Sequence, residues 1–131
     1  MKTADLLLKK NIKPSLSRIM IYDYLKGTKS HPSVDAIYDK IVKKAPTLSK
    51  TTVYNTLKIF YESGLLKELT IEGFQSRYDA DTSFHGHFFC SGCKKVFDFC
   101  INLGSESGLD GFEINQKDVF YTGLCRICHN K

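Results

Sequence analysis

Two pairs of cysteines, each pair separated by two residues, most strongly constrain what this chain can fold into. They are Cys90 with Cys93 and Cys125 with Cys128, and together they offer the four thiolates that a tetrahedral structural Zn²⁺ ion requires. Gly92 eases the first turn. The spacing of 32 residues between Cys93 and Cys125 exceeds the roughly 15–20 residues of common zinc ribbons. We therefore expect the site to tie the C-terminal end of the chain to a central strand.

Other uses of these cysteines are weighed against a zinc site. Disulfides would consume the thiols without binding metal, and the run from Cys125 to His129 matches the C-x-x-C-H pattern of covalent haem attachment. A CxxC thiol oxidoreductase needs an accessible cysteine of low pKa, usually in a βαβ context. We find no helix start directly after either pair, and no nucleophile or base motif that would indicate a zinc enzyme. We expect that the protein is not an enzyme.

The charged residues divide the chain into a basic first part and a weakly acidic second part. The chain has 131 residues and a formal net charge of +5. Residues 1–78 carry 14 Lys and Arg against 7 Asp and Glu, whereas residues 79–131 carry 5 against 7. The length suits one ordinary domain or two very small ones. We expect two domains, 1–78 and 79–131, of which the basic first one attracts nucleic acid.

The composition is that of a folded soluble protein. Hydrophobic residues make up 42% and charged residues 25% of the chain, and no apolar run approaches the roughly 18 residues of a membrane span. The first residues include Asp5 and lysines rather than the apolar segment of a secretory signal. We expect a cytoplasmic protein with no membrane partner, where cysteines more often bind metal than form disulfides.

The apolar residues of the first part recur at the spacing of helices. We expect helices at residues 3–11, 16–27, 34–45 and 50–63, with Ser33 and Ser49 as N-caps and Gly64 as a C-terminal cap. The predicted buried faces are Leu6, Leu7 and Leu8; Leu16, Ile19, Met20 and Tyr24; Val34, Ile37, Tyr38, Ile41 and Ala45; and Val53, Leu57 and Phe60.

A two-stranded hairpin is predicted after the fourth helix. Leu69 and Ile71 alternate with polar residues, Gly73 permits a turn, and residues 75–78 can return as a second strand. Helices followed by such a hairpin have the order of a winged helix-turn-helix domain. The predicted fold class is therefore α+β, with a winged helix first and a small α/β domain second.

The fourth helix presents a polar outer face that suits DNA. A helix fits the major groove, where Thr, Asn, Tyr and Lys side chains bond phosphates or base edges. An ordinary solvated surface gives the same polar pattern, but the basic charge and the hairpin favour DNA. The expected DNA-binding residues are Lys50, Thr51, Thr52, Tyr54, Asn55 and Lys58.

The residue pattern of the second part predicts a strand, a cysteine turn and a second strand. A glycine-rich connection around a short helix is expected at residues 104–111, followed by strand character at residues 112–124. Cys100 is expected to be a partly buried strand thiol. A part of this size buries too little apolar surface to fold alone, so a metal or a second chain should stabilise it.

A second set of metal ligands is predicted from strand alternation. In a strand through residues 84–90, His85 and His87 point to one face and Cys90 to the other. The histidines and the thiolate therefore belong to different sites. Asp98 lies within an apolar strand, where a carboxylate needs a partner or a metal, and Asp79 precedes the first strand. Nitrogen and oxygen ligands together favour iron, manganese or zinc.

These motifs resemble the ferric uptake regulator family of bacterial metal-dependent repressors, over residues 6–128. The most specific parts are SKTTVYNTL at residues 49–57, which resembles the family's recognition helix, YD at 78–79, H-x-H-x-x-C-x-x-C at 85–93 and G-x-C-x-x-C at 123–128. The resemblance implies a homodimer with an N-terminal winged helix, a hinge and a C-terminal α/β dimerisation domain. It also implies a palindromic double-stranded DNA operator as partner.

The resemblance assigns a role to each ligand. His31 comes from it alone, because this residue lies far from the other ligands in the sequence. A metal that joins His31 to the hinge would hold the two recognition helices at the spacing of two operator half-sites. The implied sets are Cys90, Cys93, Cys125 and Cys128 for structural Zn²⁺, and His31, Asp79, His85, His87 and Asp98 for a regulatory Fe²⁺ or Mn²⁺.

Within the family, the carboxylates resemble those of the peroxide repressors. Aspartate stands at both 79 and 98, where iron-responsive members typically carry Glu at one or both positions. Lys117 replaces a histidine that commonly ligates a further metal, so that site is expected to be absent. In peroxide repressors, ferrous iron reacts with hydrogen peroxide and a ligand histidine is oxidised, which makes His31 and His85 the candidates here. The alternatives are an iron-responsive ferric uptake regulator and, less favoured, a zinc uptake regulator.

Overall fold

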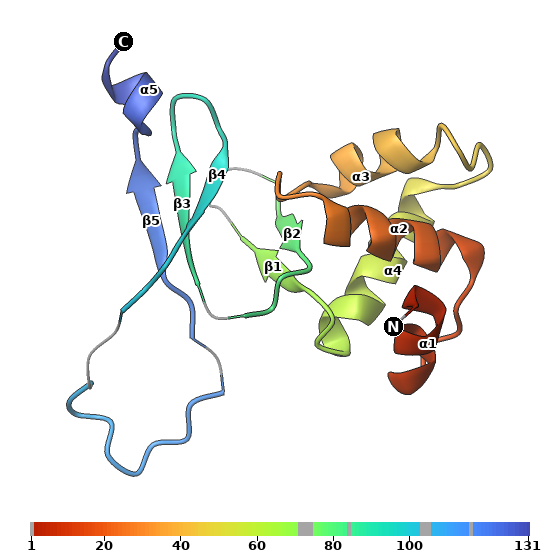
Figure 1. Cartoon of the computed structure of the whole chain (residues 1–131), viewed down its shortest axis with the longest axis horizontal. Coiled ribbons are helices and arrows are strands. Elements are labelled where there is room, and N and C mark those ends of the chain that lie inside the picture. Colours follow the sequence, from red (N-terminus) through yellow and green to blue (C-terminus); the bar gives the residue numbers. More distant parts are fainter. Residues whose placement is uncertain (1, 71–74, 84, 103–105, 116) are drawn as a thin grey trace. The chain divides into compact units, whose positions relative to one another are not determined.

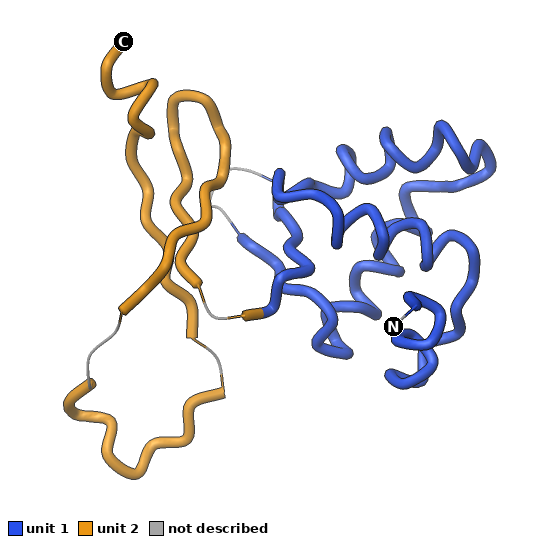
Figure 2. The backbone as a smooth tube through the Cα atoms, in the orientation of Figure 1, with its two compact units in different colours: residues 1–82 blue, residues 83–131 orange. Residues whose placement is uncertain are grey.

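The computed structural model describes residues 2–70, 75–83, 85–102, 106–115 and 117–131 (Figure 1). The chain forms two compact units, Met1–Thr82 and Ser83–Lys131, which Figure 2 shows in two colours. The division lies after Thr82, whereas the charges divide the chain after Tyr78. The difference arises because Asp79 ends a strand that pairs within the first unit.

The first unit has the element order of a winged helix. Its helices are α1 (Thr3–Lys9), α2 (Leu16–Gly27), α3 (Val34–Ile41) and α4 (Lys50–Glu62). They are followed by β1 (Lys67–Leu69) and β2 (Arg77–Asp79), which pair antiparallel with Lys67 opposite Asp79. The predicted winged helix-turn-helix is confirmed. The expected strand residue Ile71 and turn residue Gly73 lie outside the described residues.

Local signals set the ends of these helices. The hydroxyls of Ser15, Ser33 and Ser49 each accept a hydrogen bond from the backbone N–H three residues later, which satisfies a donor that the first turn of a helix leaves unpaired. After α4, Gly64 adopts a positive φ of 81°, the left-handed conformation in which helices commonly end. The predicted caps at Ser33, Ser49 and Gly64 are thus confirmed.

The core of the first unit centres on Phe60 of α4, which is fully buried and meets the ring of Tyr22 edge-on at 5.7 Å between centroids. The fully buried residues of α2 are Ile21, Tyr22 and Leu25. The expected face is confirmed only in part, because the side chain of its first residue, Leu16, is 72% exposed. Both sets of residues follow helical spacing, and packing against α4 selects between them.

The remaining predicted residues of the four helices are buried to different degrees. On α1 only Leu7 is fully buried, while Leu8 is 57% exposed. Ile19, Met20 and Tyr24 of α2 pack at the edge of the core. The predicted faces of α3 and α4 are confirmed by the buried residues Ile37, Ile41, Val53, Leu57 and Phe60 and by the partly buried Val34, Tyr38 and Ala45.

The second unit is built on a three-stranded sheet. Its central strand, β3 (Gly86–Cys90), pairs antiparallel with β4 (Val96–Phe99) and parallel with β5 (Phe120–Gly123). A single-turn helix, α5 (Arg126–His129), follows β5. The sequence did not predict α5, and the strand expected over residues 112–124 is confined to 120–123.

The connection between β4 and β5 contains no helix among its described residues. The short helix expected within residues 104–111 is therefore not found in residues 106–111. Gly108 and Gly111 have φ values of 91° and 79°, which a right-handed helix cannot contain. Cys100 lies just past β4 and is exposed, so the expectation of a partly buried strand thiol is wrong.

The second unit has a thin apolar core. Among its described hydrophobic residues only Phe89, Cys90 and Val96 are buried. Eight of the twelve exposed large hydrophobic residues of the described chain belong to this unit, among them Phe112, Tyr121 and Ile127. No helix within the described residues has the length and the hydropathy that crossing a membrane requires.

The burial of α2 leads to a stability prediction. We expect Ile21→Ala to lower the free energy of unfolding by about 2–5 kcal/mol, because it opens a cavity in the core. The matched change Leu16→Ala should alter it by no more than about 0.5 kcal/mol, because this side chain faces solvent. Urea unfolding followed by circular dichroism measures both values. Equal destabilisation by the two substitutions would contradict the observed face of α2.

Candidate metal centres and DNA-binding surface

The four cysteines of the two CxxC pairs come together in the second unit. Cys90 ends β3, Cys93 follows in the turn, and Cys125 and Cys128 stand at the start of α5 and within it. The parallel pairing of β3 with β5 brings α5 to this turn, and the N–H of Ser91 donates to the carbonyl of Gly123 at 2.8 Å. The four sulfur atoms all lie within 4.8 Å of one another.

The arrangement fits a tetrahedral zinc ion. With Zn–S bonds of about 2.3 Å, neighbouring sulfurs of a tetrahedron lie about 3.8 Å apart, and the Sγ atoms of Cys93 and Cys125 are separated by 3.9 Å. A Cβ at position 92 would come within 2.9 Å of the Cys128 sulfur. Gly92 therefore allows the turn to approach the fourth ligand.

Backbone donors favour the thiolate at this site. The N–H groups of Cys125 and Cys93 donate to the sulfur of Cys90 at 3.3 and 3.4 Å, and they lower the pKa of Cys90 to about 6. A backbone donor at Cys128 lowers the pKa of Cys125. The sulfurs of Cys90 and Cys125 hold the proton of Cys128 and raise its pKa to about 12. Such a pattern is expected where like charges converge and a dication would neutralise them.

A cluster of two histidines and one carboxylate lies on the opposite face of the same sheet. His87 stands directly across from Asp98 in the pairing of β3 with β4. The Oδ1 atom of Asp98 is 3.4 Å from Nε2 of His87 and 3.3 Å from Nε2 of His85. The Nδ1 atom of His85 lies 2.8 Å from the carbonyl oxygen of Ser83. This contact orients the ring so that Nε2 faces Asp98.

The first unit brings His31 and Asp79 together. The N–H of Tyr78 donates to the carbonyl of Pro32 at 3.0 Å and thereby fastens the loop before α3 to β2. Nε2 of His31 lies 3.4 Å from Oδ2 of Asp79, whose other oxygen accepts from the N–H of Asp81 at 2.9 Å. His31 has a φ of 52°, an uncommon conformation for a residue other than glycine that is often found at functional sites.

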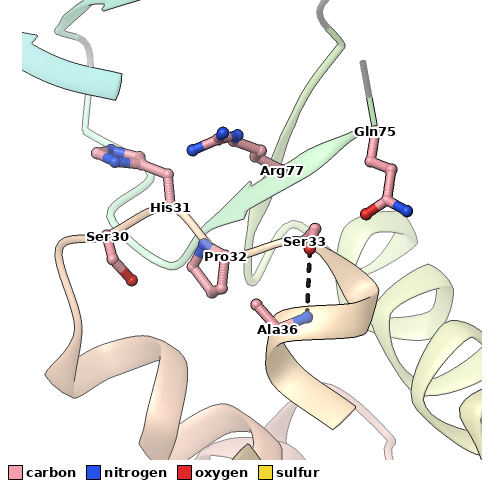
Figure 3. Close-up of a pocket in the computed structure, with 7 residues that line it drawn as sticks. All are labelled: Ser30, His31, Pro32, Ser33, Ala36, Gln75 and Arg77. Carbon is pink, nitrogen blue, oxygen red and sulfur yellow. Dashed lines mark hydrogen bonds between the residues drawn. The ribbon is translucent and has the colours of Figure 1, made fainter. Parts of the chain in front are cut away.

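His31 also lines a cavity of 390 Å³ in the first unit. Figure 3 shows that His31 and Pro32 enter the cavity wall from the loop before α3, whereas Gln75 and Arg77 come from the segment that forms β2. The loop that carries His31 and the segment that forms β2 therefore line the same cavity.

The histidine and aspartate distances suit metal ligation. The N···O separations of 3.3–3.4 Å exceed the usual 2.7–3.2 Å of a hydrogen bond. Neighbouring ligands of a divalent ion with bonds of about 2.1 Å lie about 3.0–3.4 Å apart. Imidazole and carboxylate donors suit iron, manganese or zinc. Lys117, in contrast, forms an ion pair with Glu106 at 3.8 Å.

Sequence reasoning placed these ligands in one set but did not give the contacts that orient them. The pairing of His87 with Asp98 follows from the β3–β4 hairpin, in which the N–H of Cys90 donates to the carbonyl of Lys95. Counting the residues outward from Cys90 and Lys95 along the two strands would have found the pairing of His87 with Asp98. The contact of His31 with Asp79 has no signal in sequence spacing, whereas the bond from the N–H of Asp81 to Asp79 is a local contact that an aspartate commonly makes two residues on.

All six expected DNA-binding residues of α4 have exposed side chains: Lys50, Thr51, Thr52, Tyr54, Asn55 and Lys58. Lys50 forms an ion pair with Asp35 at 3.1 Å, and Nε2 of Gln75 donates to the other oxygen of Asp35 at 2.9 Å. These donors lower the pKa of Asp35. Asp35 thus links the first residue of α4 to the wing, a contact that the sequence did not predict.

Comparison with known proteins shows which family this chain resembles. The sequence model of the ferric uptake regulator family matches residues 9–126. The peroxide operon regulator of Bacillus subtilis (strain 168) is 38% identical over 119 residues, which cover 87% of this chain and 82% of that protein. The peroxide-responsive repressor PerR of Staphylococcus epidermidis (strain ATCC 12228 / FDA PCI 1200) is 32% identical over 127 residues, which cover 93% and 85%.

The fold of this chain is also similar to that of a solved structure. The crystal structure of the Campylobacter jejuni peroxide stress regulator has a TM-score of 0.73 at 26% identity and covers 98% of this chain and 100% of that chain. The family match spans most of the sequence, and the fold agrees with it. This chain therefore belongs to the ferric uptake regulator family.

Proposed function

We propose that the protein is a metal-dependent, DNA-binding transcriptional repressor that senses hydrogen peroxide through oxidation of a histidine at a regulatory Fe²⁺ or Mn²⁺ site. The observation that carries the proposal is that aspartates pair with the histidines in both units: Asp98 with His85 and His87, and Asp79 with His31. The similarity to proteins named as peroxide regulators supports it. In this role the protein acts in the cytoplasm as a regulator and not as an enzyme.

Two metals have separate tasks in this proposal. Zn²⁺ bound by the four cysteines stabilises the second unit, whose buried apolar core is thin. The regulatory ion takes His31 and Asp79 from the first unit and His85, His87 and Asp98 from the second. Each set alone offers two or three ligands, fewer than the six that octahedral ions such as Mn²⁺ prefer. The need for more ligands favours one shared ion.

Sharing the ion would make DNA binding depend on it. His31 lies two residues before the first residue of α3, and Asp79 is the last residue of the wing strand β2. Ligands from the second unit would therefore restrain both the helix-turn-helix and the wing. The ion shifts the population toward the DNA-binding arrangement by its greater affinity for that arrangement.

Peroxide would reverse this restraint by changing a ligand. Fe²⁺, when bound, would activate hydrogen peroxide, so that the O–O bond breaks, one oxygen leaves as water and the other is added to a ligand histidine, which is oxidised by two electrons. His31 and His85 are the histidines proposed to gain the oxygen atom as 2-oxo-histidine. An oxidised ring loses its value as a nitrogen ligand, so the two ligand sets separate. Mn²⁺ would support DNA binding without this sensitivity.

The surface of each unit supports a DNA-bound homodimer. The exposed polar face of α4 would enter the major groove, and the excess of Lys and Arg in residues 1–78 would attract the phosphates. The exposed apolar residues of the second unit would be covered by a second copy of the chain. A two-fold dimer matches a palindromic operator.

The zinc proposal predicts the effect of losing one cysteine. We expect the wild-type protein to contain one zinc per chain and Cys93→Ser to lose it, together with dimerisation and thermal stability. Cys100→Ser is the matched control, because Cys100 is exposed and outside the cluster. Elemental analysis and light scattering measure zinc content and mass. Wild-type protein without zinc and with its four thiols oxidised would indicate disulfides instead.

Asp98 tests the regulatory site. We expect Asp98→Asn to raise the Mn²⁺ concentration needed for half-maximal operator binding by at least about tenfold, since it removes the ligand charge shared by two histidines. Asp110→Asn, an exposed acid of the same unit, should leave that concentration unchanged. Fluorescence anisotropy with an operator selected from random duplexes gives both values. An unchanged Mn²⁺ requirement in Asp98→Asn would exclude this residue from the site.

The peroxide mechanism is tested on anaerobic protein loaded with Fe²⁺. After equimolar hydrogen peroxide, we expect a gain of one oxygen on the peptide that contains His31 or His85, and loss of operator binding. Protein loaded with Mn²⁺ should show neither change. Peptide mass spectrometry and anisotropy provide the readouts. Intact peptides with DNA binding retained would favour an iron-responsive regulator.

A further inference from the structure

We propose that a cavity between the start of α2 and the outer face of α4 binds one phosphate of the DNA backbone. The cavity measures 320 Å³, and its polar lining is formed by Lys13, Ser15, Ser17, Arg18, Thr52, Asn55 and Thr56. Of these residues, only Thr52 and Asn55 were among the expected DNA contacts. The proposal rests on the proposed DNA-binding function and specifies how α4 is held on its operator.

The cavity has the charge that an anion requires. Lys13 and Arg18 supply two positive side chains, and none of the residues that line it is acidic. Nη1 of Arg18 donates to the carbonyl of Lys13 at 3.0 Å, which fixes the guanidinium against the preceding loop. A guanidinium has five N–H donors in a planar fork, so this bond leaves others for a phosphate.

The first turn of α2 contributes backbone donors. Ser15 caps the helix and accepts from the N–H of Arg18, which places the N-terminal end of a 12-residue helix beside the cavity. The first N–H groups of a helix have no acceptor within it, and the helix dipole adds partial positive charge at this end. Both features favour a phosphate group.

Thr56 provides an independent indication of a ligand. Its side chain lines the cavity, yet the residue is only 3% exposed. Its hydroxyl forms no hydrogen bond to any residue in the part of the chain that the structure describes. Its oxygen is not sealed from solvent, so the hydroxyl reaches the open space of the cavity, where its proton is available to a ligand. A phosphate oxygen in the cavity would accept from this hydroxyl.

The position on α4 explains what such a contact achieves. Thr52, Asn55, Thr56 and Ile59 lie at helical spacing along one side of α4, next to the start of α2. A phosphate bound there would contact α2 and α4 of the winged helix domain at once. It would fix the register and depth of α4 in the major groove, while the side chains on the rest of its exposed face remain available to base edges.

The test compares two cations of α2. We expect Arg18→Gln to weaken binding to operator and non-operator duplexes by the same factor, about tenfold, and to reduce the salt dependence of binding by about one ion. Lys26→Gln, the same charge change at the exposed far end of α2, should keep the wild-type salt dependence. Anisotropy across a salt series with Mn²⁺ present measures both quantities.

Thr56 gives a second test without a change of charge. Thr56→Val should lower the affinity for both duplexes about three- to tenfold, and Thr56→Ser, which keeps the hydroxyl, should bind as the wild type does. Circular dichroism and thermal melting confirm that the variants fold. Wild-type affinity and salt dependence in both Arg18→Gln and Thr56→Val would overturn the cavity proposal.

The remaining outcomes separate this proposal from its alternatives. Loss of operator binding alone, with non-operator binding unchanged, would assign these residues to base readout and overturn the phosphate contact. Inorganic phosphate that binds the wild type but not Arg18→Gln, with DNA affinity equal in both, would show a site for the free ion instead. Wild-type protein that binds no duplex with Mn²⁺ would refute the proposed function itself.

Discussion

The alternation of side chains along β3 is the constraint on which the second unit depends. This strand is central in the sheet, and it sends His87 and Phe89 to one face and Phe88 and Cys90 to the other. The pairing is held in register by Gly86, because the ring of Phe99 occupies the space where a Cβ at position 86 would lie. A shift of one residue would exchange the faces, so that His87 would no longer lie on the side of Asp98, nor Cys90 on the side of the other cysteines.

In the first unit, a ligand pair is built into the joints of the helix-turn-helix. His31 precedes the cap of α3, and Asp79 ends the wing. The bond between Tyr78 and Pro32 ties these two segments together, and Asp35 connects the wing with the start of α4. On the proposed function, restraint of His31 and Asp79 by an ion would therefore act on the elements that are proposed to touch DNA. On this proposal the effect of the ion need not be transmitted through the core, because the ligands belong to the segments next to α3 and to the wing strand β2.

The parts of this architecture that were predictable from sequence are those set by local chemistry. Serine caps, Gly64 and the parity of His85, His87 and Cys90 depend on residues close in the chain, and the structure agrees with each. The buried face of α2 was predicted only in part because two overlapping faces have the same periodicity, and packing against the ring of Phe60 distinguishes them. The contact of Asp79 with His31 and the cavity beside Thr56 arise from contacts between distant segments, which spacing does not encode.

The sorting by β3 also explains how one small unit can combine zinc thiolates with peroxide chemistry. Thiolates are the sulfur species that react with peroxide, so a cysteine ligand beside the regulatory ion would compete with the histidines for oxidation. His87 and Cys90 are three residues apart on opposite faces, which separates them by about 10 Å along the strand and by the thickness of the sheet. The buried position of Cys90 and the neutralising charge of a zinc ion would protect the sulfur further. On this proposal the sheet directs the oxidation to the histidines and leaves the structural site intact.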